Sequence, residues 1–588
     1  MMITIDSGEW SIMPFRQGTP TRHAKGPSLA DGKSDGAAAR TQNHAGPIVD
    51  DAGYRASSRL GGLADTLVLV FGIATFVCLS VASLLFTVHF PTYTEGGATY
   101  RHGTIPVVVC GSIVVMVAVV LLHVTGILKR LNAGHVAWYV AAYLAIAGMG
   151  WAILANTWPD RDALDLMVSA HELGTQDDPL WSHGAYMERF PYQIPFVLFL
   201  RVLQTVFGTN AYLAVEMVNA LCSASAGYLL IRYALEVFGN EAANLTAMLS
   251  VCFLPSVLYT TFAYGNIPCM PFAIGALLVQ YRYFQNRRLR TALLSAVLVA
   301  ISILLKSTMI VILIAMCLAW LITGIVKRQW RDMVAIVSSL LVYVVCTSGI
   351  NAAVAHRYHV VTDNGLPKIA WIAMGMHTAD YPRISDIPGR YDGFVWSWQG
   401  DDYNTETATA DSKAALRQTW DHFTADPGYA ARFMGRKLPF IWTDPLYESI
   451  LESNWSTEGP RKPGAMASRP MTGVLRSVYY GRLNATILAV ADIVQFLTFL
   501  GTVLALIARR KQLHVEQMVP LIACLGMVLI YIFWEAKPQY ALPVGWLMPL
   551  YAGCGLFIAA RLCGRLCGRW LGSHHGHTAV SRSSESQK

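Results

Sequence analysis

Runs of about 20 apolar residues recur along most of this 588-residue chain, and they restrict its fold more than any other feature. Only 14% of the residues are charged, whereas a soluble domain carries about 25%. A charged side chain at the centre of a bilayer costs about 2.5–3.5 kcal/mol, and a spanning segment must satisfy its backbone hydrogen bonds internally. The sequence therefore predicts an all-α polytopic membrane protein.

The apolar runs locate the expected spans to within a few residues. A shorter run, residues 192–207, carries Arg201 and Gln204, and we expect it to lie in the membrane interface without crossing. About twelve runs are long enough to span. They cover residues 66–90, 104–128, 136–156, 211–236, 243–263, 268–285, 291–306, 308–326, 333–351, 484–507, 517–534 and 540–560.

Lysine and arginine residues are concentrated in alternate short loops, which orients the chain by the positive-inside rule. The cation-rich loops include Lys129–Arg130 and Arg509–Lys511, and they predict a cytoplasmic N-terminus. The net charge of +8 therefore reflects topology and does not indicate a nucleic-acid partner. Two long segments, 157–210 and 352–483, are then expected on the extracytoplasmic side of the membrane.

The N-terminal segment lacks apolar periodicity and an early apolar core, which indicates a disordered tail and not a signal peptide. The remaining boundaries follow the apolar runs. The expected parts are a cytoplasmic tail (1–60), an extra N-terminal transmembrane hairpin (61–135), a transmembrane core (136–351) that contains the first outer loop (157–210), a large outer loop (352–483), C-terminal transmembrane helices (484–560) and a second cytoplasmic tail (561–588).

Three carboxylates cluster where the chain leaves a predicted span. In "NTWPDRDALDLMVSAHELG", Asp160, Asp162 and Asp165 follow Pro159, and this pattern predicts a helix that begins here. Acids in the first turn of a helix interact favourably with the helix dipole. This structural role explains one of the three carboxylates well, but it explains a cluster of three less well. A carboxylate in a cavity beside the membrane can instead have a raised pKa and act as a general base. These residues alone leave open which carboxylate would do so.

Further motifs follow this cluster in a characteristic order. "FPYQ" leads the predicted interfacial helix, "ILLKSTMIVIL" places Lys306 in a short outer turn, and "MGRKLPFIWTDP" places Lys437 late in the large loop. "FWEAKPQYALPVGWLMPL" then opens the last span. Over residues 136–560 this order resembles the GT-C glycosyltransferases. Among these enzymes, the chain resembles the family-39-like membrane transferases of Gram-positive bacteria. That branch includes relatives of protein O-mannosyltransferases and of aminoarabinose transferases of lipid A.

The resemblance implies a GT-C-like bundle with juxtamembrane helices in the first outer loop. It also implies an inverting transferase that moves a sugar from a polyprenyl-phosphate donor to an extracytoplasmic acceptor, which would be an envelope glycan, a lipid or a protein. The position that matches the family's general base is Asp162.

The leaving phosphate needs a cation to stabilise its developing charge. Lys306 and Lys437 are the candidates. The alternatives are that Lys306 only extends its ammonium to the membrane interface, and that Lys437 is a solvated charge in a loop. Glu535 and Tyr540 could bind the donor sugar or lipid head, or form a helix-end pair. The candidate substrate-binding residues are Asp160, Arg189, Tyr192, Gln193, Glu535 and Tyr540.

No cofactor or metal site is predicted. Many relatives carry Asp-Glu in the first loop, whereas Asp162 is followed by Ala163 here, so a metal-assisted reaction has no support in the sequence. The histidines of the first loop would need further ligands at matching geometry to hold a metal ion.

A transporter or a flippase of lipid-linked oligosaccharides is the alternative function. Such a protein is expected to show paired repeats and key charges near the membrane midplane. This chain instead concentrates its acids and aromatics in two unequal outer loops. One aromatic stretch, "YDGFVWSWQGDDYN", would suit a sugar acceptor, or would form an aromatic belt or a small packed subdomain.

Overall fold

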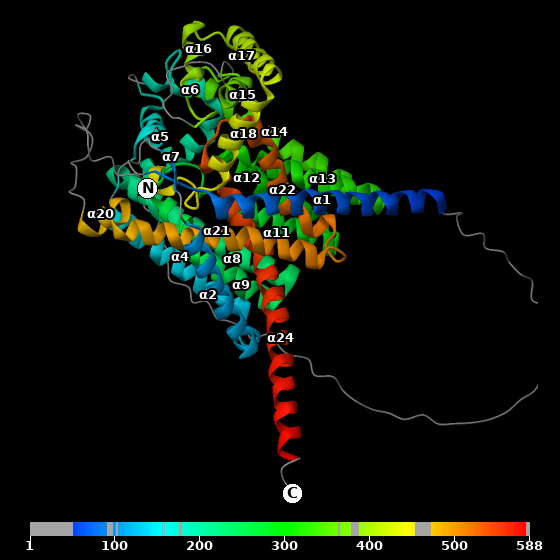
Figure 1. Cartoon of the computed structure of the whole chain (residues 1–588). Coiled ribbons are helices and arrows are strands. Elements are labelled where there is room, and N and C mark those ends of the chain that lie inside the picture. The colour runs from blue at the N-terminus through cyan, green and yellow to red at the C-terminus, as the bar shows by residue number, and fades with distance from the viewer. Residues whose placement is uncertain are drawn as a thin grey trace, which may run out of the picture. The chain divides into compact units, whose positions relative to one another are not determined.

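The computed structural model describes residues 51–90, 98–101, 104–155, 157, 159–175, 179–362, 365–377, 387–452 and 472–583. These residues form helices almost throughout (Figure 1). The predicted N-terminal tail lies outside them as far as residue 50, and helix α1 (Asp51–Leu85) begins inside the remainder of that tail. Helix α24 (Pro549–Ser583) likewise continues through most of the predicted C-terminal tail.

Eight helical segments among the described residues are long and apolar enough to cross a membrane, or up to ten if two bent pairs are each one span. The predicted class, an all-α polytopic membrane protein, is confirmed, whereas the predicted count of about twelve is not. The eight segments contain α1, α2 (Ile105–Val124), α4 (Ala133–Ala155), α7 (Ile194–Phe207) with α8 (Ala211–Phe238), α13 (Ile310–Val326), α14 (Trp330–Tyr358), α21 (Arg482–Arg509) and α22 (Val515–Phe533).

The difference in count arises where the helices are short or bent. Helix α9 (Asn240–Cys252) and the segment Pro255–Thr261 meet at 55°, and the segments Pro538–Leu547 and Pro549–Leu566 meet at 53°. Each break precedes a proline, whose ring and missing N–H end a regular helix. Helices α11 (Met270–Asn286) and α12 (Leu289–Leu305) have 17 residues each and pack against one another.

The first outer loop consists of short helices. Helix α7 has 14 residues, a length of about 21 Å, and is shorter by itself than the roughly 30 Å of a bilayer core. It packs against α5, α8, α12 and α14. The elements of this loop are α5 (Arg161–Glu172), η2 (Pro179–Trp181), α6 (Tyr186–Arg189), η3 (Pro191–Gln193), α7 and η4 (Gly208–Asn210).

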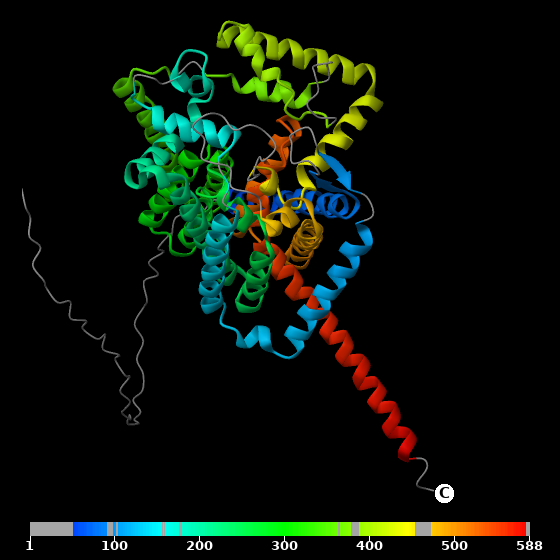
Figure 2. The same cartoon turned by 90° about the vertical axis from the view of Figure 1, so that its left-hand side faces the viewer.

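The large outer loop has an apolar cluster of its own, centred on Trp398 and Met374. Figures 1 and 2 show α15, α16 and α17 gathered at one end of the transmembrane helices, beside α5 and α6. Phe190 of the first loop packs against this cluster. The elements of the large loop are α15 (Lys368–Met376), η7 (Phe394–Trp396), α16 (Ser397–Gly400), α17 (Thr405–Ala425), α18 (Pro427–Trp442), α19 (Ser449–Glu452) and α20 (Gly473–Tyr480).

A two-stranded hairpin joins the first two spans to the large loop. Strands β1 (Thr87–His89) and β2 (Thr99–Arg101) are antiparallel, with Val88 opposite Tyr100. The Val88 N–H donates to the Thr443 carbonyl at 3.1 Å, just beyond α18. The remaining short elements are α3 (Ile127–Arg130), α10 (Pro255–Leu258), η5 (Tyr259–Thr261), η6 (Ser307–Met309), η8 (Pro538–Ala541) and α23 (Leu542–Leu547).

Small residues allow the transmembrane helices to approach closely. Helices α21 and α24 cross where Gly501 faces Gly555, and a Cβ at position 555 would overlap the Gly501 carbonyl. Because helices in lipid gain stability from close backbone packing, this crossing is expected to hold the C-terminal spans together.

Gly555→Ala is therefore expected to destabilise the protein by about 1–3 kcal/mol, the usual cost of overpacking, because a backbone atom cannot move away as a side chain can. The measurement is the melting temperature of the purified chain in detergent. Gly150→Ala in α4 is the matched control, since its Cβ would meet no atom within 4 Å and alanine favours the helix. Equal melting temperatures for both variants would contradict this packing.

Candidate functional site

The predicted helix of the first outer loop begins where the acids cluster. Asp160 is its N-cap, and its side chain accepts a hydrogen bond from the Arg161 N–H at 2.9 Å. Arg161 has φ of 50°, a left-handed conformation that costs a non-glycine residue about 1–3 kcal/mol. Asp162 lies in the first turn and is exposed. Asp160 thus has a structural role as a cap, whereas the Asp162 side chain is exposed and available for other contacts.

Asp162 faces aromatic and cationic groups from other segments. Its carboxylate lies close enough to Tyr186, Tyr192, Tyr264 and Lys306 to interact with them electrostatically. Tyr264 and Lys306 lie 102 and 144 positions beyond Asp162 in the sequence. The packing of α5 on α7, and of α7 on α12, brings these distant segments to one place. The structure therefore brings together two site residues predicted in separate motifs, Asp162 and Lys306.

Lys306 lies in a tight turn between α12 and η6, and its ammonium is 3.9 Å from the centre of the Tyr264 ring. Gln193 donates a hydrogen bond to the hydroxyl of the same tyrosine. Burial is the main reason that the pKa of Lys306 falls to about 7, and the ammonium of Lys537 lowers it further, whereas Asp162 acts in the opposite direction. A lysine held in this way gains interaction energy when an anion binds beside it.

Glu535 and Tyr540 form the predicted pair. The Tyr540 hydroxyl donates to Oε2 of the buried Glu535 at 2.7 Å, and the Tyr540 ring stacks on Tyr531 with centroids 5.5 Å apart. Tyr192, which is 40% exposed, interacts electrostatically with both Glu535 and Asp162. Tyr192 thus lies between the pair and the carboxylate of the first loop.

Lys437 is enclosed by protein. Its side chain is fully buried, and Nζ donates to the carbonyls of Gly375 at 2.6 Å and Ile532 at 3.0 Å. Burial lowers the pKa of Lys437 to about 7, and the carboxylate of Glu535 opposes this shift. A neutral amine has two N–H groups, which match the two carbonyls. This geometry favours a structural role for Lys437, joining α18 to α15 and to the end of α22.

Arg189 is buried against the aromatic stretch of the large loop. Its guanidinium lies 4.1 Å from the centre of the Trp396 ring, and burial lowers its pKa. Trp396 is 48% exposed, and its indole N–H donates to the Tyr391 hydroxyl at 2.5 Å. Arg189 therefore supports an exposed aromatic ring, and its predicted part in substrate binding stays a prediction.

Glu452 and Lys537 were not predicted as site residues. Lys537 Nζ and Glu452 Oε1 form an ion pair at 2.9 Å, and both side chains are largely buried. Burial alone would raise the pKa of Glu452, but the charges of Lys537 and Arg161 hold it below its ordinary value. The signal in the sequence was the spacing of Asp444, Glu448 and Glu452, three acids at intervals of four residues.

The strained turn before Glu452 is held by Asp444. Tyr447 and Glu448 have φ of 52° and 61°, and the Asp444 carboxylate accepts hydrogen bonds from the N–H groups of Leu446 at 2.9 Å and Glu448 at 2.6 Å. Burial raises the pKa of Asp444 to about 6. Backbone strain of this kind persists only where surrounding contacts enforce it, and it clusters at functional sites.

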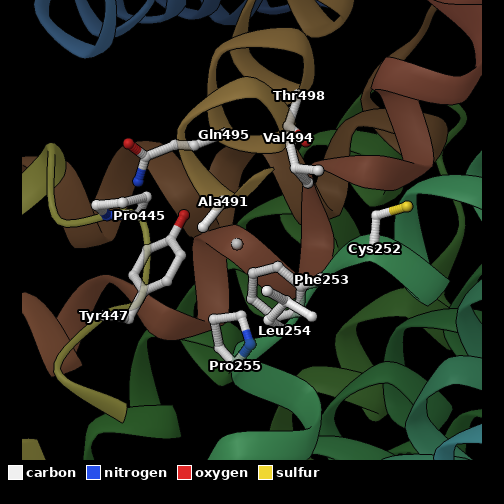
Figure 3. Close-up of a pocket in the computed structure, with 11 residues that line it drawn as sticks. Cys252, Phe253, Leu254, Pro255, Pro445, Tyr447, Ala491, Val494, Gln495 and Thr498 are labelled. Atoms are coloured by element: carbon white, nitrogen blue, oxygen red, sulfur yellow. The ribbon is translucent and has the colours of Figure 1, made fainter. Parts of the chain in front are cut away.

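Hollows of different sizes lie near these groups, and one of about 20 Å³ is lined by Asp444 and Glu448. A groove of about 620 Å³ runs between α5 and α7 and ends at Tyr212. A cavity beside Tyr447 and Gln495 (Figure 3) has a volume of only about 10 Å³, which is too small for a substrate. Within the described parts of the chain, no three histidine, cysteine, aspartate or glutamate side chains cluster as a metal ion would require, and metal dependence stays untested.

Residues 194–350 match the model of the dolichyl-phosphate-mannose-protein mannosyltransferase family, over about a quarter of the chain. This match confirms the resemblance to the GT-C superfamily. The Gram-positive branch stays a prediction. No curated protein matches the sequence.

Two solved structures of the oligosaccharyltransferase of Archaeoglobus fulgidus are similar to the chain. One is AglB in complex with an inhibitory peptide and a dolichol-phosphate, at 16% identity over 73% of this chain with a TM-score of 0.36. The other is the apo form, at 15% identity over 72% of this chain with a TM-score of 0.36. The chain spans about half the length of these structures, 50% of each.

Lys437→Met is expected to lower the stability of the protein, because the carbonyls of Gly375 and Ile532 lose their donor at about 1–3 kcal/mol for each unsatisfied group. The measurement is the melting temperature in detergent, with Lys413→Met on the exposed side of α17 as the matched control. A Lys437→Met protein with an unchanged melting temperature and weakened binding of a polyprenyl phosphate would instead support the predicted phosphate contact.

Proposed function

We propose that this chain is a membrane glycosyltransferase that moves a sugar from a polyprenyl-phosphate donor to an extracytoplasmic acceptor. The observation that carries the proposal is the convergence of Asp162 and Lys306 around Tyr264. One group is a carboxylate suited to accept a proton, and the other is a cation suited to a phosphate. The family match over residues 194–350, which include Lys306 and Tyr264, supports the same chemistry.

Asp162 is the proposed general base. Its carboxylate accepts the proton of an acceptor hydroxyl while the oxygen of that hydroxyl forms a bond to the anomeric carbon. The bond from the anomeric carbon to the phosphate oxygen breaks at the same time, and the electron pair leaves with the polyprenyl phosphate. Attack opposite the leaving group inverts the anomeric centre.

Lys306 is the proposed partner of the leaving phosphate. Its ammonium lies in a half-buried turn, where a charge interaction is worth more than in water. Lys537 is a second cation in the same neighbourhood, and its pair with Glu452 fixes its position. Two cations near one anion offset the charge that develops as the phosphate departs.

The acceptor would approach over exposed aromatic rings. Tyr192 is 40% and Trp396 48% exposed. The centroid of the Phe190 ring lies 6.1 Å from that of Tyr192, and the Arg189 guanidinium contacts the rings of both Phe190 and Trp396. Rings of this kind stack on the apolar faces of sugars. The plasma membrane of a bacterium, with the site on its outer side, is the setting that fits the distribution of cations in the loops.

The alternative of a transporter or flippase is less well supported. Its key charges would line a path near the midplane, formed by paired repeats. The charged groups described here lie instead at helix ends and in loops, at Asp162, Lys306, Glu452 and Lys537.

Asp162→Asn is expected to reduce sugar transfer by at least 10²-fold, since the amide cannot accept the proton. The assay follows transfer of radiolabelled sugar from a polyprenyl-phosphate donor to envelope material from cells that lack the chain. Asp160→Asn is the matched control, because asparagine caps a helix as well as aspartate does. If Asp162→Asn transferred sugar at the rate of the unaltered protein, the assignment of the base would be wrong.

Donor binding is expected to depend on pH through Lys306. The ammonium is charged below pH 7 and loses its proton as the pH rises through its pKa of about 7, so kcat/KM for the donor should fall by up to about tenfold per pH unit above that value. Lys306→Arg, which stays charged, should remove this dependence even if its activity is lower. The measurement is the donor kcat/KM between pH 6 and 9 for both proteins, and parallel profiles would contradict the role of Lys306.

A further inference from the structure

The groove between α5 and α7 has no part in the proposed reaction. Its volume of about 620 Å³ is within the range of sites for small molecules, roughly 300–1,000 Å³. The wall on α5 is largely apolar, with Leu164, Met167 and Val168, and ends in the exposed His171. The opposite wall is on α7 and includes Arg201 and Thr205.

The groove faces away from the proposed catalytic carboxylate. Leu164, Val168 and His171 recur at intervals of three and four residues, so they share one face of α5. Asp162 precedes Leu164 by two residues, which turns its side chain about 200° away from that of Leu164 on a helix with 3.6 residues per turn. An occupant of the groove would therefore lie behind α5, separate from the donor and acceptor at Asp162.

Arg201 presents a fixed cation to this groove. Its Nη1 donates to the carbonyls of Ala170 at 3.2 Å and His171 at 3.0 Å, which holds the guanidinium across the end of α5. Arg201 makes no ion pair with any residue that the structure describes. The remaining N–H groups of a guanidinium held in place are well suited to the oxygens of a phosphate.

The outer side of α7 is apolar and uncovered. Val202, Val206 and Phe207 are 60%, 67% and 49% exposed, and the helix belongs to one of the segments apolar enough for a membrane. These residues flank the groove-lining Thr205 and Gly208. The groove thus combines an apolar wall, a neighbouring lipid-facing surface and one cation that pairs with no carboxylate among the described residues.

We propose that this groove binds an anionic glycerophospholipid of the outer leaflet. An acyl chain lies along Leu164, Met167 and Val168, and the headgroup phosphate accepts hydrogen bonds from Arg201. A soluble anion would leave the apolar wall in contact with water. A zwitterionic lipid carries its own cation, which competes with Arg201 for the phosphate, whereas the phosphate of an anionic lipid has no such competitor. The bound lipid fills the space between α5 and α7 and so supports the helix that carries Asp162 from its far side.

The test uses the full-length chain purified in a mild detergent, with native mass spectrometry and titration with phosphatidylglycerol or phosphatidylcholine. One phosphatidylglycerol is expected to bind, at least tenfold more tightly than phosphatidylcholine. Thr205→Trp, which fills the groove, and Arg201→Gln, which removes the cation, should each weaken phosphatidylglycerol binding at least tenfold. Val202→Trp is the matched control on the exposed side of α7 and should bind like the unaltered protein.

Melting temperatures measured without added lipid identify variants that fail to fold, and Thr205→Trp preserves the test if Arg201→Gln is unstable. Equal binding of phosphatidylglycerol by folded Thr205→Trp and Val202→Trp would overturn the proposal, as would equal binding of the two phospholipids. A polyprenyl phosphate that competes for the same site would assign the groove to the donor and contradict it as well. Asp162→Asn should keep the lipid, so loss of transfer and loss of lipid binding are separate results.

Discussion

The exclusion of charge from the bilayer determines where this protein can carry out polar chemistry. The acids and cations of the proposed site lie at helix ends and in loops, because each would cost several kcal/mol in the hydrocarbon. Asp492 within α21 is buried instead, and its carboxylate accepts a hydrogen bond from Thr87 at 3.1 Å. Asp162 begins a helix, Lys306 ends one, and Lys537 precedes another. The packing of these segments against one another brings the helix ends together, and the site is a consequence of that packing.

Buried polar groups connect the site to the rest of the structure. Lys437 ties the large loop to the end of α22 through two carbonyls, and the hairpin of β1 and β2 contacts Thr443 just beyond α18. The strained turn at Tyr447 and Glu448 is held by Asp444 and leads directly to Glu452. Each of these contacts limits the movement of the loop relative to the spans, which positions a cation and a carboxylate without placing either in lipid.

The aromatic and apolar surfaces divide the outer face into two regions on opposite sides of α5. Tyr192 lies on the side of Asp162 and suits a sugar, while Leu164 and Val168 line a groove that suits a lipid chain. A single helix therefore separates the proposed chemistry from the proposed lipid site. Its position depends on contacts from both sides, including those of Arg201 with the carbonyls at its C-terminal end.

The sequence by itself determined the membrane class and the helix that begins at Asp160, because apolar run length and capping are local properties. It also indicated Asp162 and Lys306 through separate motifs. Only the tertiary structure decided that these two meet, that Lys437 is enclosed by carbonyls, and that Glu452 pairs with Lys537. Such contacts join residues far apart in the chain, and the energy of burying a charge depends on neighbours that no local pattern specifies.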